Sequence, residues 1–65
     1  MPSTVIRRFA YASELSELTI EFVSGRRYVY SDVPAEVAES MRAAFAKGSY
    51  FNRNIRDNYP CRELA

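Results

Sequence analysis

The sequence contains no histidine, one cysteine and two glycines. Without histidine, neither a Ser-His-Asp nor a Cys-His catalytic arrangement can be built. The single cysteine, Cys61, cannot form an internal disulfide, and alone it makes neither a zinc site nor a redox pair of familiar spacing. Gly25 and Gly48 do not form a phosphate-binding glycine-rich loop. We therefore expect a protein that is not an enzyme and that uses no metal and no cofactor.

Long hydrophobic runs are also missing. No segment approaches the length of a membrane span, and the first residues lack the apolar run of a signal peptide. Because no internal disulfide is available, the fold depends on packing, which suits a reducing compartment. We therefore expect a cytoplasmic protein that does not enter a membrane. The formal net charge is only +1, so the chain as a whole has no strong attraction for nucleic acid.

The chain does carry enough apolar residues for one thin core. It has 65 residues, of which 48% are hydrophobic, including five tyrosines and four phenylalanines. This composition argues against disorder, and the length fits a single small domain over residues 1–65.

The middle of the chain has the pattern of a β-hairpin. In its first half, alternate residues are apolar, as in a strand with one buried face: Leu18, Ile20 and Phe22. Ser24-Gly25 then supplies a residue that tolerates positive φ, and Tyr28 and Tyr30 resume the alternation.

The length of the hairpin turn decides which face carries Tyr28 and Tyr30. A two-residue turn places both tyrosines on the face of the sheet that does not carry Ile20 and Phe22. There they form an exposed pair able to stack on bases or bind a partner. A three-residue turn with Gly25 in the left-handed region joins them to the apolar face. Packing favours the three-residue turn, and both alternatives are carried forward.

Residues 5–11 form the expected first strand. Val5, Phe9 and Tyr11 share one parity and Ile6 and Ala10 the other, whereas Arg7 and Arg8 interrupt both faces, as in an edge strand. A loop over residues 12–16 leads into the hairpin.

Two helices are expected after the hairpin. The first runs over residues 34–46 and ends at Gly48, with an apolar stripe at helical spacing: Val37, Met41, Ala44 and Phe45. The second runs over residues 49–57, begins at the cap residue Ser49 and buries Phe51, Ile55 and Tyr59. The predicted fold class is α+β: a three-stranded antiparallel β-meander with two short helices packed on one face.

Several short sequence motifs, in this order, resemble the KTSC domain: Tyr28-Val29-Tyr30, Asp32-Val33-Pro34, Lys47-Gly48-Ser49-Tyr50-Phe51-Asn52, Ile55-Arg56 and Tyr59-Pro60. The resemblance extends from about Ser3 to Pro60. That family is named for its occurrence at the C-terminus of some lysyl-tRNA synthetases, and it also forms short free-standing proteins. The resemblance implies the fold, and the association with the synthetase suggests RNA binding. The sequence departs from the family at Cys61, where an aromatic residue is expected, which leaves the packing of that end open.

Positive charge is concentrated near the C-terminus. Residues 47–62 contain four cations against one acid, and eight of the nine cations in the chain are arginines. Arginine pairs phosphates in bidentate fashion and stacks on bases, and a cationic track with aromatic platforms holds single-stranded RNA. The alternative is that a surface helix shows two arginines to water while its aromatic residues serve the core.

We therefore predict a small non-catalytic binding module for RNA or another nucleic acid. The predicted nucleic-acid-binding residues are Arg26, Arg27, Tyr28, Tyr30, Lys47, Tyr50, Asn52, Arg53 and Arg56. The alternative is a protein-interaction module that acts as a homodimer or within a larger assembly, because a small sheet has open edges and the net charge is near zero.

Overall fold

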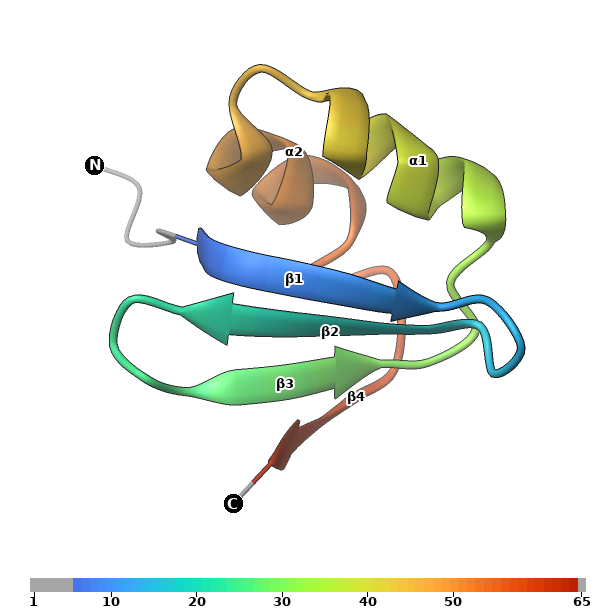
Figure 1. The fold of residues 1–65 in the computed structure, drawn as a ribbon, viewed down its shortest axis with the longest axis horizontal. Coiled ribbons are helices and arrows are strands. Elements are labelled where there is room, and N and C mark those ends of the chain that lie inside the picture. Colours follow the sequence, from blue (N-terminus) through green and yellow to red (C-terminus); the bar gives the residue numbers. More distant parts are fainter. Residues whose placement is uncertain (1–5, 65) are drawn as a thin grey trace.

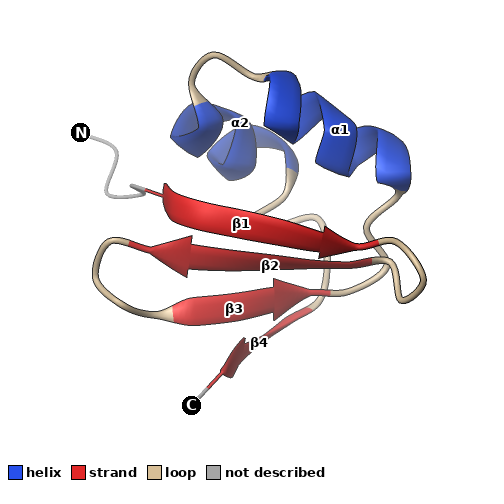
Figure 2. Cartoon of the chain, in the orientation of Figure 1, coloured by secondary structure: helices blue, strands red, loops and turns tan. Residues whose placement is uncertain are grey.

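Over residues 6–64 the protein folds into four antiparallel strands and two helices. The computed structural model describes residues 6–64. Its elements are β1 (Ile6–Ala12), β2 (Glu17–Phe22), β3 (Arg27–Tyr30), α1 (Ala35–Ala43), α2 (Lys47–Asn54) and β4 (Cys61–Leu64). The strands lie in the sheet in chain order, and both helices lie on one side of it (Figure 1, Figure 2). The predicted α+β class is confirmed, but the sheet has four strands rather than three.

The β2–β3 hairpin closes through the three-residue turn. The Phe22 amide donates to the Arg26 carbonyl at 2.9 Å, and the Gly25 amide donates to the Phe22 carbonyl at 2.9 Å. Gly25 has φ +96°, the left-handed region that the turn requires. In the resulting register Tyr28 pairs with Ile20. The tyrosines of β3 therefore share the face that packs against the helices, and the alternative of an exposed aromatic pair is wrong.

A β-bulge changes the predicted faces of β1. The register with β2 shifts between Ile6 and Arg8. Since the bulge inserts one residue, Ile6 falls on the same face as Phe9 and Tyr11, and all three pack against the core. The prediction that Ile6 faces the other way is wrong for this reason. Val5 lies outside the described residues.

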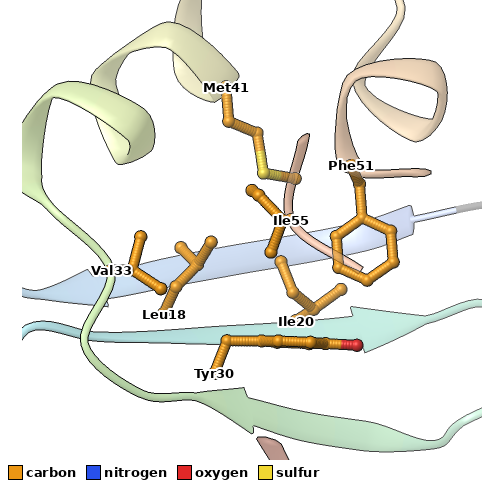
Figure 3. Close-up of a cluster of buried hydrophobic side chains, with 7 residues drawn as sticks. All are labelled: Leu18, Ile20, Tyr30, Val33, Met41, Phe51 and Ile55. Carbon is orange, nitrogen blue, oxygen red and sulfur yellow. The ribbon is translucent and has the colours of Figure 1, made fainter. Parts of the chain in front are cut away.

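The core lies between the sheet and the two helices (Figure 3). Its buried cluster contains Leu18, Ile20, Tyr30, Val33, Met41, Phe51 and Ile55. Phe51, only 2% exposed, touches rings on two strands: its ring centroid is 5.6 Å from that of Phe22 and 5.3 Å from that of Tyr30. Burying one such side chain contributes about 1.5–3 kcal/mol, which is a large share of the stability of a chain this short.

The helices begin and end at different residues from those predicted. The first helix, α1, begins after Pro34 and ends at Ala43, and the backbone of Ala44 is extended with ψ 138°. Phe45 consequently leaves the predicted apolar stripe and is fully exposed. The second helix begins at Lys47, so Gly48 lies within its first turn instead of ending the first helix. Among residues 6–64, no helix is long and apolar enough to cross a bilayer.

The strand missed by the sequence pattern is β4. It pairs with the outer edge of β3, with Cys61 opposite Tyr30 and Arg62 opposite Val29. The Ser31 amide donates to the Pro60 carbonyl at 2.8 Å and so begins this pairing. The strand gives the backbone groups on that edge of β3 hydrogen-bonding partners.

Candidate functional site

A hollow of about 430 Å³ opens where the β2–β3 hairpin, the segment after α2 and β4 meet. It is named here the Tyr28 hollow. Its lining residues are Phe22, Ser24, Arg26, Tyr28, Tyr30, Phe51, Arg56, Asp57 and Cys61. The Tyr28 hollow brings together four of the predicted site residues, namely Arg26, Tyr28, Tyr30 and Arg56.

Aromatic rings in edge-to-face contact form part of its wall. The Phe22 and Tyr28 centroids lie 5.9 Å apart with the ring planes at 71°. Phe22 also contacts Phe51, and Phe51 contacts Tyr30. These contacts anchor the wall to the core. Tyr28 is half-buried, whereas Tyr30 is only 5% exposed, so Tyr28 is the tyrosine whose ring a ligand can reach.

Tyr30 is held in its neutral form. Burial raises the pKa of its hydroxyl to about 12, and the adjacent Cys61 thiol adds to this effect through charge and hydrogen bonding. The positive charge of Arg56 acts in the opposite direction. Tyr30 is thus a structural member of the wall, and the prediction that it contacts nucleic acid has little exposed surface to support it.

Arg26 is positioned by two neighbours at the edge of the Tyr28 hollow. A hydrogen bond to Tyr28, followed by the charge of Glu63, raises the pKa of the Arg26 guanidinium above its ordinary value. Its Nε lies 3.9 Å from a Glu63 carboxylate oxygen. This contact is long and exposed, so it is a weak ion pair.

Arg53 and Arg56 differ from the five arginines that form an ion pair with a carboxylate. Five arginines have a carboxylate oxygen within 4.0 Å: Arg7, Arg8, Arg26, Arg42 and Arg62. Within residues 6–64, no carboxylate lies that close to the guanidinium of Arg53 or Arg56, and both side chains are exposed. Arg53 belongs to the last turn of α2, and Arg56 follows two residues after that helix ends.

The remaining predicted residues do not line the Tyr28 hollow. The Lys47 ammonium donates to the Ala44 carbonyl at 2.9 Å, and Tyr50 packs against the core. Asn52 is half-buried on α2. Arg27 pairs with Glu21 in the β2–β3 ladder, and because side chains alternate along a strand it points away from Tyr28, to the face without helices.

That helix-free face of the sheet carries charges that are largely matched. The Arg8 Nε lies 2.8 Å from a Glu21 oxygen, and an Arg62 nitrogen lies 3.7 Å from a Glu17 oxygen. Arg62 belongs to the predicted C-terminal concentration of charge. Because it pairs with β2 on this face, the positive charge of residues 47–62 is divided between two sides of the molecule.

Sequence reasoning missed five residues of the Tyr28 hollow: Phe22, Ser24, Phe51, Asp57 and Cys61. Phe22 and Phe51 were assigned to the core, and they serve both core and wall. Cys61 and Asp57 carried no local signal. The pairing of β4 with β3 brings Cys61 to the site, and Asp57 reaches it from the segment after α2. Among residues 6–64, no group of three or more acidic or cysteine side chains is placed to hold a metal ion.

Comparison with known proteins places this arrangement in a family. A family model described as the KTSC domain matches residues 2–59. The lysine–tRNA ligase of Nostoc punctiforme is 39% identical over 62 residues, which are 95% of this chain and 11% of that protein. The lysine–tRNA ligase of Trichormus variabilis is 37% identical over 60 residues, 92% of this chain and 11% of that protein. The chain therefore spans about a tenth of the length of these ligases.

Two shorter proteins are similar along most of their length. An uncharacterized protein of Stutzerimonas stutzeri is 36% identical over 59 residues, covering 91% of this chain and 83% of that protein. The crystal structure of a KTSC domain protein from Yersinia pestis has a TM-score of 0.87 and 26% identity, and covers 100% of this chain and 94% of that one. The resemblance seen in the sequence is confirmed: the chain belongs to the KTSC domain family.

Proposed function

We propose that this domain binds single-stranded RNA without catalysing a reaction. The observation that carries the proposal is a pair of exposed arginines, Arg53 and Arg56, that have no close carboxylate among residues 6–64. Arg56 lines the hollow that contains Tyr28, and Arg53 lies three residues before it in the last turn of α2. The similarity to lysine–tRNA ligases supports RNA as the nucleic acid, because their name states that they act on a tRNA.

The state of the arginines matters for phosphate binding. An arginine held by a carboxylate at hydrogen-bond distance must give up part of that ion pair before it can bind a phosphate with both nitrogens. Arg42, which pairs with Glu39 on α1, is in that position. Arg53 and Arg56 can bind a phosphate without breaking an ion pair to any described carboxylate. They are therefore the residues that we expect to bind phosphate.

The test is a salt titration of RNA binding by fluorescence anisotropy with a labelled single-stranded RNA. Removing one phosphate-binding side chain should reduce the slope of log K against log salt by about 0.7. The double variant Arg53→Ala/Arg56→Ala should therefore reduce it by about 1.4. Arg42→Ala is the matched control, because it removes an exposed but paired arginine, and should leave the slope unchanged. Absence of salt-dependent binding by the folded wild-type protein would contradict the proposal.

A protein-interaction module is the second candidate function. Phe45 is fully exposed in the α1–α2 connection, and Leu15 and Val23 are exposed in two other loops. Among the described strands, β1 and β4 each have one neighbour in the sheet, so each leaves an edge open. Light scattering separates this candidate from the first: a homodimer would support it, and a monomer that still binds RNA would favour the RNA proposal.

A further inference from the structure

We infer that the Tyr28 hollow receives one unpaired nucleotide, with its base against the Tyr28 ring and its phosphate near Arg26 and Arg56. This inference rests on the proposed RNA binding and adds the form of RNA that is recognised. It also distinguishes Tyr28 from the other aromatic residues of the domain.

The base has a place because Tyr28 is both accessible and fixed. The Tyr28 ring is half-buried and lines the hollow, whereas Tyr30, which also lines it, is only 5% exposed. Phe22 holds the Tyr28 ring through an edge-to-face contact, and the backbone of Tyr28 is fixed by its pairing with Ile20 in the β2–β3 ladder. A ring held in one orientation gives up little conformational freedom when a base stacks on it. The hollow, at about 430 Å³, is in the size range of small-ligand sites.

The phosphate has a place because two cations reach the Tyr28 hollow from different elements. Arg26 comes from the β2–β3 turn and Arg56 from the segment after α2. The long contact of Arg26 with Glu63 leaves guanidinium donors for another anion. Asp57 also lines the hollow and its negative charge opposes a phosphate there. The geometry therefore predicts that removing this charge strengthens binding.

The nucleotide must be unpaired for physical reasons. Inside a duplex each base is stacked on both faces and paired along its edge, so its ring cannot enter a hollow in a protein surface. The Tyr28 hollow is closed on one side by Cys61 at the start of β4, and on others by Phe51 and Tyr30 of the core. Entry thus requires a base that has left its stack, as in a loop or a single strand.

The first experiment uses the wild-type protein and three labelled probes: a uridine oligonucleotide, an abasic oligonucleotide with the same number of phosphates, and an RNA duplex. Stacking of one base corresponds to roughly 5- to 150-fold in affinity. The abasic probe and the duplex should therefore bind at least about fivefold more weakly than the uridine probe. Equal binding of all three would overturn this inference and leave RNA binding intact, whereas no binding of any probe would overturn the proposed function itself.

Three variants then locate the effect. Tyr28→Leu should reduce binding of the uridine probe to the level of the abasic probe, and Tyr28→Phe, which keeps the ring, should retain most of the affinity. Asp57→Asn should bind both probes more tightly than wild type, because it removes the negative charge beside the phosphate. Circular dichroism establishes that each variant is folded. A folded Tyr28→Leu that still prefers the uridine probe as wild type does would overturn the inference.

Discussion

The buried hydroxyl of Tyr30 makes the stability of this domain depend on alkaline pH. Its pKa of about 12 in the folded protein exceeds the ordinary value of 10.0 because burial disfavours the phenolate and the Cys61 thiol adds to that effect. The folded state therefore holds this proton more tightly than the unfolded state. The resulting stabilisation is complete below pH 10 and is lost as the pH rises through 12.

The size of the effect follows from the pKa difference of about two. A pKa difference of one corresponds to about 1.36 kcal/mol. Tyr30 therefore contributes on the order of 2–3 kcal/mol to the unfolding free energy below pH 10, and about half of this is lost near pH 11. A domain of this length has a total stability of only about 3–10 kcal/mol, so the loss is measurable. Urea unfolding followed by circular dichroism, near pH 9 and near pH 11, measures it directly.

Tyr30→Phe is the matched control, because it keeps the ring that contacts Phe51 and removes the titrating group. Other groups that titrate at high pH are shared by both proteins, so only the difference between them reports on Tyr30. Wild type should lose on the order of 1 kcal/mol more than Tyr30→Phe between the two pH values. Parallel losses in the two proteins would refute the reasoning, as would a Tyr30 absorbance titration centred near pH 10.

Two further predictions concern the stability of the fold. Phe51→Ala should lower the unfolding free energy by about 3–5 kcal/mol because Phe51 is 2% exposed. Phe45→Ala, at a fully exposed position, should change it by less than about 0.5 kcal/mol. Comparable changes for both variants in urea unfolding would contradict this assignment of the core. Gly25→Ala should cost about 1 kcal/mol through its φ of +96° alone, because a Cβ there meets nothing within 4 Å. An unchanged melting midpoint for Gly25→Ala would show that the turn does not hold this conformation.

Local patterns were sufficient for the hairpin and for the α+β class. The alternation of Leu18, Ile20 and Phe22 located β2, and the position of Gly25 favoured the turn that the structure has. The bulge at Arg7 was not predictable, because both parities of β1 contain apolar residues and only pairing with β2 selects between them. Phe45 fitted a helical stripe that continues only if the helix does, and the helix ends at Ala43.

The candidate site was predictable only in part for a related reason. Arg26, Tyr28 and Arg56 were singled out by residue type, and the structure does place them around one hollow. Arg27 differs from Arg26 by a single position, which on a strand is enough to send it to the opposite face. Residues 61–64 are too few and too polar to indicate a strand by themselves. Their pairing with β3 depends on a partner far away along the chain.

The pairing of Tyr30 with Cys61 has a kinetic consequence. Both helices lie in the chain between these two neighbours, so the contact closes one of the longest loops in the molecule. The entropy of closing a loop grows only slowly with its length, whereas folding rates fall markedly as the mean sequence separation of contacts increases. The length of this loop therefore lowers the rate at which the native sheet forms more than it lowers the stability of the sheet.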